Sequence, residues 1–487
     1  MSQLPPAFDF YKRARSEMIH EGFKPDFPGP VMTEVNGASA APLGAGACRD
    51  LRELLWSSID NKESRDLDQI EWAERLADGK IRVLVGIADV DTIVKKGSAT
   101  DAHARENGAS VYTGGPVFPM LPERLSTNLT SLGPNVDRAA LIMEFVVGTD
   151  GEVVCADVCT AAVRNRAQLN YEQVGAWLRD GSGAPCSGDV PAGLPEQLHL
   201  QAEAAARLHR FRQENGALTF GNAETIPIVV NNSVTGFAMF PENPARDIIE
   251  SFMIAANVAM ARFLRAKNCL CVRRIVRTPK RWDRIQALAA AVGVHLPQDP
   301  DPKALGNFLA ARKQADPDHF PELSLAVLKS MGPGEYIVEH PGSEHEGHFG
   351  LAVNDYTHST APNRRFADLL MQRLLKAAID QRPQPYSESE LGALATHCTD
   401  RETAARHVER FMKKVAAAVL LAPQIGKTFD AIVTGASSNG VFARLLSVPA
   451  EGRIVRGEHG LDIGQKVRVR LAAADANKGF IDLEVSG

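Results

Sequence analysis

The chain has no excess of positive charge, few aromatic residues and no cysteine pattern of a zinc-binding or disulfide-rich protein. Its 487 residues carry a formal net charge of −5, so the overall composition gives no electrostatic sign of a nucleic-acid partner. Aromatic residues make up only 6% of the chain. The seven cysteines are an odd, scattered set, and the two close pairs, Cys155 with Cys159 and Cys269 with Cys271, lack a second pair at zinc-site spacing. We interpret them as reduced thiols in a reducing compartment.

Long apolar runs are also missing. The start of the chain, MSQLPPAFDFYKRAR, lacks the apolar core of a signal peptide, and no apolar run is long enough to cross a bilayer. These absences argue against a membrane protein and make the cytoplasm the expected location. The 44% hydrophobic and 23% charged residues are typical of an ordinary globular protein.

The pattern of elements divides the chain into three parts. Residues 1–45 contain an expected helix at 8–19, followed by a Pro/Gly-rich stretch interpreted as a linker or extended arm. Residues 46–422 begin with strands and continue with long helices, which predicts an α+β domain. Residues 423–487 contain short strands separated by Gly, Asn and Asp turns, which is typical of a small all-β barrel.

Two segments of the large part predict its sheet. Residues 81–90 are β-branched and apolar on both faces, as expected of a central buried strand. Residues 141–158 have the pattern of a hairpin that turns at Asp150 and Gly151.

Three aspartates form a candidate metal site within SSIDNKESRDLDQ. Asp66 and Asp68 project from one face of an extended backbone, and a polar loop allows Asp60 to return to the same place. Two converging carboxylates about 4 Å apart repel by roughly 4 kcal/mol at an effective dielectric of about 20, so a cation is needed between them. All-oxygen ligands favour magnesium, with manganese as the alternative. A solvated acidic loop with an Asp helix cap explains the spacing equally well.

A basic pair follows an expected helix start in STAPNRRFADLL. Ser359 to Pro362 have the residue types of an N-cap and first turn, which predicts Arg364 and Arg365 in that turn. The helix dipole disfavours cations there, so an accepted basic pair suggests a bound anion such as phosphate. The alternative is an arginine paired with Asp368 or with a carboxylate of the core. The expected buried stripe of this helix comprises Phe366, Leu369, Leu370 and Leu374.

Two further segments concentrate positive charge. The segment 271–281, CVRRIVRTPKR, holds five basic residues and is a candidate phosphate-contacting patch, with an ordinary solvated face as the alternative. In the C-terminal part, Lys466, Arg468 and Arg470 alternate with apolar residues, which predicts an outward basic row on one strand.

Several motifs together resemble the RNase II (RNB) family. Asp60, Asp66 and Asp68 fit its pattern of one Asp, five residues, then Asp-x-Asp-Asp. The segments IADVDTIVKKGS, SVYTGGPVFPMLPERLSTNLTSL, GHFGL and STAPNRRFADLL are similar to further family blocks, in family order over about 320 residues. The C-terminal part resembles the S1 type of OB-fold domain, which binds RNA.

The resemblance implies a hydrolytic 3′-to-5′ exoribonuclease that acts on single-stranded RNA, releases nucleoside 5′-monophosphates processively and uses a two-metal magnesium mechanism. Asp60, Asp66, Asp68 and Gln69 would surround the metal, and Arg364 would support the charge on the scissile phosphate. We expect a monomer with no obligate protein partner. The residues implied in RNA binding are Tyr112 and Phe220 as stacking rings, Tyr171 and Glu250 at the ribose, Arg365, and on the barrel Phe442, Lys466, Arg468 and Arg470. For Phe220 and Glu250 the residue types alone favour a core ring and a carboxylate on a helix face.

The sequence departs from the family pattern at two places. Gln69 stands where the family has a fourth aspartate, so one metal position has an uncharged ligand, and Glu63 and Glu71 are the neighbouring carboxylates. The first 45 residues cannot hold the two cold-shock domains of many relatives, which suggests a less enclosed RNA entrance. A non-catalytic RNA-binding protein on the same scaffold is therefore the alternative function. A translation-associated S1 protein would leave the large domain unexplained.

Overall fold

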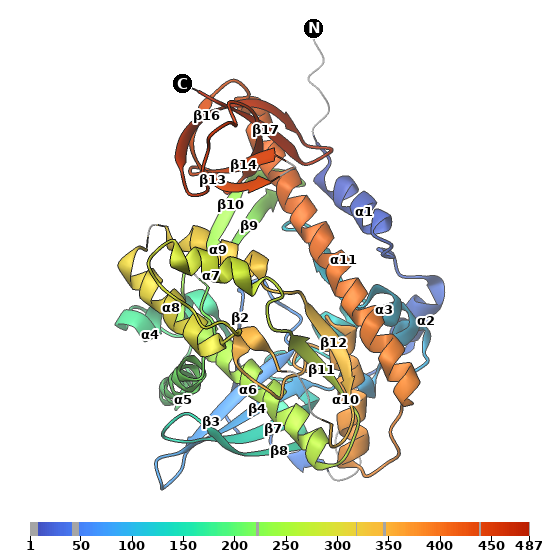
Figure 1. Cartoon of the computed structure of the whole chain (residues 1–487). Coiled ribbons are helices and arrows are strands. Elements are labelled where there is room, and N and C mark those ends of the chain that lie inside the picture. The colour runs from blue at the N-terminus through green and yellow to red at the C-terminus, as the bar shows by residue number, and fades with distance from the viewer. Residues whose placement is uncertain are drawn as a thin grey trace.

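The computed structural model describes residues 8–40, 48–220, 224–317, 319–343, 347–437 and 440–486. A large lower body is built on a curved sheet, and the long helix α11 (Glu388–Leu421) rises from it to a small barrel (Figure 1). The expected α+β domain with a C-terminal all-β barrel is confirmed. Within the described ranges, no helix is long and apolar enough to span a membrane.

Six strands form the central sheet in the order β1-β8-β2-β3-β4-β7, and β7 also pairs with β8. Their bounds are β1 Arg49–Asp50, β2 Trp56–Asp60, β3 Gln69–Arg75, β4 Ile81–Ala88, β7 Asp137–Val147 and β8 Val153–Asn170. The predicted central strand is β4, buried between β3 and β7, and the predicted hairpin is the antiparallel pair β7–β8. The hairpin turn requires Gly151, because its φ is 93° and a Cβ there would lie 2.1 Å from the carbonyl oxygen of Arg207.

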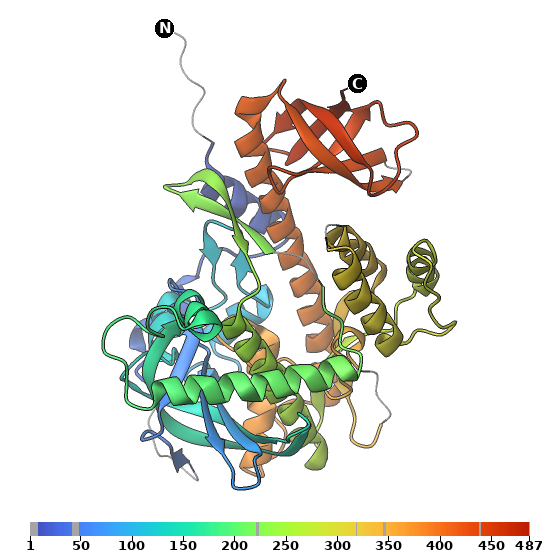
Figure 2. The same cartoon turned by 90° about the vertical axis from the view of Figure 1, so that its left-hand side faces the viewer.

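Helices cover the sheet and bury its apolar residues. They are α4 Tyr171–Asp180, α5 Leu194–Glu214, α6 Pro244–Ala266 and α10 Phe366–Ile379. Figure 2 shows α5 crossing the strands as a long straight helix. Most residues of α6 are buried, and Phe252 packs edge-on against Phe145 of β7, with the ring centroids 6.3 Å apart. This packing fixes α6 against β7.

A smaller helical group has its own core beside the sheet. It consists of α7 Trp282–Ala290, α8 Pro302–Ala315 and α9 Phe320–Ser330, next to the antiparallel pair β11 Cys271–Val276 and β12 Gly334–Glu339. Trp282, Phe308 and Phe320 are buried in this core. The remaining short elements are α3 Ala99–Asn107, β5 Val111–Tyr112, β6 Val117–Phe118, β9 Glu224–Val230, β10 Ser233–Phe240, and the short turns η1 Val90–Thr92, η2 Leu125–Leu129, η3 Phe349–Leu351 and η4 Ala422–Gln424.

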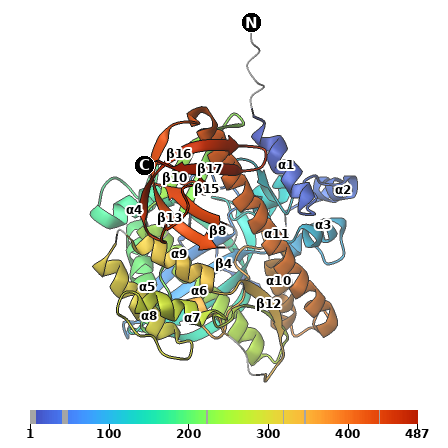
Figure 3. The same cartoon turned by 45° about the horizontal axis from the view of Figure 1, so that its top comes forward.

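The N-terminal segment is more structured than an extended arm. The expected first helix is α1 (Phe10–His20), and Figure 3 shows it beside α11. The Pro/Gly-rich stretch contains a second helix, α2 (Gly29–Gly37), so its interpretation as a linker is wrong. Pro30 occupies the first turn of α2, where a missing N–H costs nothing, and Val31 and Val35 are buried. Residues 41–47 lie outside the described residues.

The C-terminal barrel closes in the order β13-β14-β15-β17-β16. Its strands are β13 Thr428–Ser437, β14 Gly440–Leu445, β15 Glu451–Arg456, β16 Lys466–Asp475 and β17 Phe480–Val485. The last turn of α11 belongs to the barrel core through Ala417, Ala418 and Leu421. The domain boundary at residue 422, which lies in η4, stays a prediction.

Candidate active site

Asp68 is the most enclosed of the predicted aspartates, with 2% of its surface exposed. It lies immediately before β3, and Leu67 before it belongs to the main core, as the alternation of an extended backbone predicts. The backbone N–H and Nδ2 of Asn363 both donate to Oδ1 of Asp68, at 3.1 and 2.9 Å. Oδ2 of Asp68 lies 3.5 Å from Nε of Arg364. The acidic cluster and the predicted phosphate clamp therefore meet at this side chain.

The segment that carries Arg364 is a loop held by side chains. Contrary to the prediction, α10 begins only at Phe366, so Arg364 and Arg365 do not lie in its first turn. The backbone N–H of Ala361 donates to Oδ1 of Asp368 at 2.7 Å, and that of Asn363 donates to Asp68. These carboxylates bind the amides that would otherwise begin a helix. The predicted buried stripe of α10 is confirmed for Phe366, Leu369, Leu370 and Leu374.

The two arginines have different surroundings. Nε and Nη2 of Arg365 both donate to the fully buried carboxylate of Asp368, each at 2.8 Å. Arg365 thus has the partner that the sequence offered as the alternative, and a contact of Arg365 with RNA stays a prediction. The side chain of Arg364 is 47% exposed, so it reaches both Asp68 and the solvent. Arg364 is therefore the arginine of this pair that a phosphate can approach.

Tyr112 borders the same opening. Its strand β5 runs beside the loop, because the N–H of Ser110 donates to the carbonyl oxygen of Arg364 at 2.9 Å. The ring of Tyr112 is 41% exposed, and its hydroxyl is hydrogen-bonded to Arg364. Burial of the hydroxyl end raises the pKa of Tyr112 to about 12. The tyrosine therefore remains neutral at physiological pH and exposes part of its ring.

The carboxylates raise one another's affinity for protons. Burial raises the pKa of Asp68 to about 7; Arg364 and Asn363 oppose this shift, and Asp66 adds to it. Burial also raises the pKa of Asp66, with Asp60 acting in the same direction. At the end of β2, Oδ1 of Asp60 accepts hydrogen bonds from the N–H of Asn61 at 2.6 Å and the hydroxyl of Ser64 at 3.0 Å. Burial and the neighbouring carboxylates thus disfavour the ionised aspartates here, and a bound cation would favour their ionised forms.

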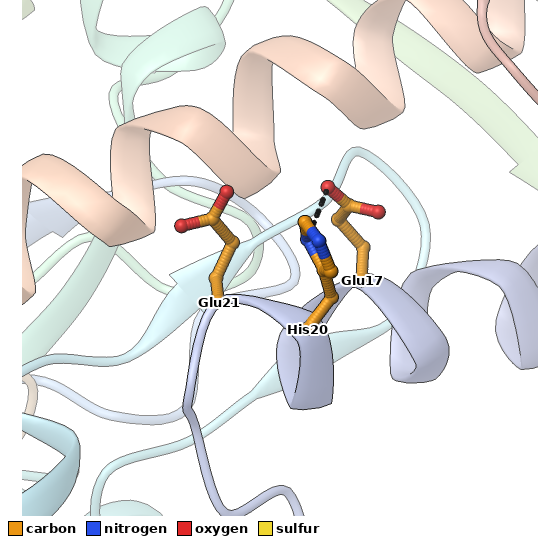
Figure 4. Close-up of side chains that lie close together, drawn as sticks. All are labelled: Glu17, His20 and Glu21. Atoms are coloured by element: carbon orange, nitrogen blue, oxygen red, sulfur yellow. Dashed lines mark ion pairs between the residues drawn. The ribbon is translucent and has the colours of Figure 1, made fainter.

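The three aspartates do not converge on a single point. Within the described ranges, the one group of three or more His, Cys, Asp or Glu residues whose ligand atoms lie within 4.8 Å of one another is Glu17, His20 and Glu21 on α1 (Figure 4). That group follows from helical spacing, and Glu17 already pairs with Arg13 and His20. The metal site at Asp60, Asp66 and Asp68 therefore stays a prediction.

Two residues of β3 complete the acidic end of the site. Gln69, at the predicted fourth ligand position, is 7% exposed. Glu71 is fully buried, and neither of its carboxylate oxygens has a hydrogen-bond partner among the described residues. Such a side chain is rare in folded proteins and requires an explanation.

Tyr171 lies next to this acidic group, at the first position of α4. The guanidinium of Arg246 lies over its ring, 4.4 Å from the centroid, and Nδ2 of Asn243 donates to its carbonyl oxygen at 2.8 Å. Burial raises the pKa of Tyr171, and the negative charges of Asp60 and Glu71 add to this shift. Its position near the aspartates fits the ribose-binding role implied by the resemblance, which no observation tests.

The other predicted RNA-binding residues lie farther along the surface. Glu250 is on the exposed face of α6, where Oε1 lies 3.9 Å from Nη2 of Arg212. Phe220 is partly buried against the core of the smaller helical group, in agreement with the core-ring alternative. On the barrel, Phe442 of β14 is partly exposed and Lys466, Arg468 and Arg470 of β16 are exposed. Their contacts with RNA stay predictions.

The basic segment 271–281 is not a surface patch in its first half. Arg273 is 1% exposed and pairs with Glu339 and Asp355, while Arg274 is 4% exposed and pairs with Glu402. Both readings from sequence, a phosphate-contacting patch and a solvated face, are wrong for these two arginines. Arg273 pairs within the β11–β12 sheet and with the loop that carries Asp355, and Arg274 joins β11 to α11.

Sequence reasoning missed Asn363 and Thr130. Asn363 is 1% exposed and orients Asp68, and the Thr130 hydroxyl lies 2.5 Å from its Oδ1. A signal was present, because Asn363 stands where the family motif TSPIRRYxDL has an apolar residue. A buried amide at a position that is apolar in the family indicates a specific hydrogen-bond partner.

A large cavity lies away from these residues. It has a volume of about 690 Å³ between α5, α6 and the segments 276–278 and 347–355. Arg212 and His348 contribute to its lining, whereas Asp60, Asp66 and Asp68 do not. The site at Asp68 is defined by its hydrogen bonds and charges and not by this cavity.

Comparison with known families assigns the large part of the chain. Residues 48–381 match the RNB domain, which covers more than half of the chain. The chain belongs to the RNB family. Residues 427–486 also match the RNase II-type exonuclease C-terminal S1 domain, in agreement with the barrel.

Similar proteins extend this RNB assignment. The chain is 29% identical to ribonuclease R 1 of Lactococcus lactis over 474 residues, which cover 89% of this chain and 56% of that protein. It is 30% identical to ribonuclease R of Escherichia coli over 446 residues, which cover 88% of this chain and 54% of that protein. The chain thus spans about half the length of these relatives.

Two solved structures share the fold. The structure of Mycoplasma genitalium RNase R in complex with ribose-methylated single-stranded RNA has a TM-score of 0.89 at 23% identity, and covers 98% of this chain and 78% of that one. Yeast Ssd1, described as a pseudonuclease, has a TM-score of 0.70 at 17% identity, and covers 91% of this chain and 55% of that one. At these identities the likeness shows the fold alone.

Proposed function

We propose that this RNB protein is a 3′-to-5′ exoribonuclease that hydrolyses the last phosphodiester of single-stranded RNA and releases nucleoside 5′-monophosphates processively. The single observation that carries the proposal is the contact between buried Asp68 and half-exposed Arg364, because it places an acidic group and a phosphate-binding group at one opening. The sequence similarity to the proteins named ribonuclease R supports the same reaction.

The donor set fits a divalent cation. Asp60, Asp66 and Asp68 offer oxygen ligands, and the carboxylate oxygens of Glu71 are buried without a hydrogen-bond partner among the described residues. Magnesium, with manganese as the alternative, would supply positive charge that polarises the phosphodiester and acidifies the attacking water.

The residues of the chain bind and orient the RNA. Arg364 would hold the scissile phosphate and stabilise the charge that develops on it. The exposed part of the Tyr112 ring offers a stacking surface for a terminal base, and Tyr171 and Glu250 would read the 2′-hydroxyl. Asn363 keeps Asp68 in place, so little reorganisation is needed during the reaction. The proposal includes a single chain that acts in the cytoplasm without an obligate protein partner.

A 5′-labelled single-stranded RNA tests the proposal. The wild-type protein should shorten the labelled RNA from its 3′ end in the presence of magnesium. With EDTA the RNA should keep its full length. Asp68→Asn should reduce the rate by at least about a hundredfold while the RNA is still bound, because the carboxylate is lost and the shape is kept. The matched control, Asp50→Asn at the exposed end of β1, should retain the wild-type rate. A wild-type protein that binds the RNA but never shortens it would reject the proposal.

The alternative is an RNA-binding protein that has lost catalysis. Two observations favour it: Gln69 replaces a family aspartate, and the yeast pseudonuclease Ssd1 shares the fold. The labelled-RNA assay separates the two functions, since a binding protein shifts the RNA in a gel and leaves its length unchanged.

A further inference from the structure

Glu71 is fully buried in the sheet, and among the described residues neither of its carboxylate oxygens has a hydrogen-bond partner. The residue paired with Glu71 on β2 is Ser57, and the residue paired with it on β4 is Val85. The Ser57 hydroxyl is itself buried and has no hydrogen-bond partner within the described ranges, and valine offers no polar atom. An isolated buried carboxylate costs several kcal/mol, so a fold retains one only where something compensates it.

The position of Glu71 connects it to the acidic site. Gln69 and Glu71 are two residues apart on β3, so their side chains project from the same face of the strand. Asp60 and Tyr171 both lie within electrostatic range of the Glu71 carboxylate. Glu71 therefore lies on the same face of β3 as Gln69, one side-chain step farther along the strand.

We propose that Glu71 supplies the fourth carboxylate of the divalent-cation site, replacing the aspartate that the family has at the position of Gln69. This inference rests on the proposed function, since it assigns a ligand to the cation of that site. A cation shared by Asp60 and Glu71 would neutralise two charges that otherwise repel each other. The number of carboxylates at the site is then the same as in the family, although one has moved along the strand.

The test measures binding of Mn²⁺ to the full, metal-stripped chain without RNA, by electron paramagnetic resonance. Glu71→Gln should weaken Mn²⁺ binding by at least about tenfold. The double variant Gln69→Asp with Glu71→Gln moves the carboxylate back to the family position and should recover most of the affinity. Glu63→Gln removes the other neighbouring carboxylate from the exposed loop and should bind as the wild type does.

Thermal denaturation provides a second readout that separates a ligand from a structural residue. Metal-free Glu71→Gln should melt at or above the wild-type temperature, because an unpaired buried charge is removed, and Mn²⁺ should no longer raise its melting temperature. If Glu71→Gln does not fold, Glu71→Asp keeps the charge but shortens its reach and should also lose Mn²⁺ affinity. Wild-type affinity in a folded Glu71→Gln or Glu71→Asp variant would overturn the inference.

The failure of this inference differs from the failure of the proposed function. A wild-type chain that binds Mn²⁺ through Glu71 but never shortens RNA would reject the nuclease alone. If the protein shortens RNA but its Mn²⁺ affinity is the same in the wild type and the Glu71 variants, only the ligand assignment is rejected.

Discussion

At the scale of single residues, the site depends on how Asp68 is held. A buried carboxylate needs donors, and Asp68 has the amide and side chain of Asn363 on one oxygen and Arg364 near the other. Hydrogen bonds to an ionised group contribute about 1.5–3 kcal/mol each, more than bonds between neutral groups. The arrangement leaves Oδ2 directed toward the opening, where a substrate or cation meets it.

We therefore predict that Asn363→Leu impairs the chemical step. The variant retains the backbone donor but loses the Nδ2 donor, so Asp68 is held by one bond fewer and its orientation is less fixed. We expect kcat to fall by about tenfold or more with little change in KM, and the free energy of unfolding to fall by about 1–3 kcal/mol. Single-turnover digestion of labelled RNA and urea denaturation measure the two effects.

Asn128→Leu is the matched control for this variant, because Asn128 is exposed and lies two residues from Thr130, which is hydrogen-bonded to Asn363. It should change neither kcat nor stability. An Asn363→Leu protein with reduced stability but the wild-type kcat would show that Asn363 supports the fold without positioning Asp68.

At the scale of elements, strand β16 carries basic side chains that could attract RNA, and acidic residues on the adjacent strands partly neutralise them. Lys466 and Arg468 point outward as predicted, but Asp430 on β13 is the register neighbour of Arg468, and Arg470 pairs with Glu484 on β17. The basic row is thus partly neutralised by the strands on either side. Its contribution to RNA binding should be moderate and sensitive to salt.

We predict that Lys466→Ala with Arg468→Ala weakens binding of a long single-stranded RNA several-fold at low salt, with little loss at high salt. If both residues contact phosphates, the slope of log K against log salt should decrease by about 1.4, at about 0.7 per phosphate on a single strand. Filter binding over a range of salt concentrations measures the slope. Arg456→Ala with Lys478→Ala removes the same charge from other exposed positions of the barrel and should leave the slope unchanged.

The elements differ in how far the sequence predicts them. Strand β4, the β7–β8 hairpin and the barrel follow from local patterns, because neighbouring residues alone determine alternation and turn chemistry. The loop 359–365 does not, since the groups that replace its helical hydrogen bonds include Asp68, which is distant in sequence. For the same reason the buried ion pairs of Arg273 and Arg274 were not predicted: a basic run looks the same whether its partners are solvent or distant carboxylates. The candidate site residues came from family motifs, and the unpartnered state of Glu71 required the structure.

At the scale of the whole molecule, α11 connects three hydrophobic cores. Its first half contributes Leu391 and Leu394 to the core of the large domain, its middle contributes Val408 and Met412 to the core shared with α1, and its end enters the barrel. The barrel therefore cannot change its position without disturbing α11 or the residues that hold it. Arg444 of the barrel adds an ion pair with Glu322 of α9, and Nε of Arg13 on α1 donates to the carbonyl oxygen of Asn477, so contacts beyond α11 also hold the barrel.

We predict that Met412→Ala loosens the N-terminal helices and the barrel together. Met412 is fully buried, and its truncation should cost about 2–5 kcal/mol through lost burial and a cavity. Because α1 and the barrel both pack on this half of α11, backbone hydrogen exchange should accelerate in α1 and in β13–β17 while β3 and β4 remain protected. Leu446→Ala, at a residue that is 50% exposed on the barrel, is the control and should leave all of these rates unchanged. Faster exchange confined to α1 would show that the barrel is stable without this packing, and uniform acceleration that includes β3 and β4 would show that the molecule unfolds as a single unit.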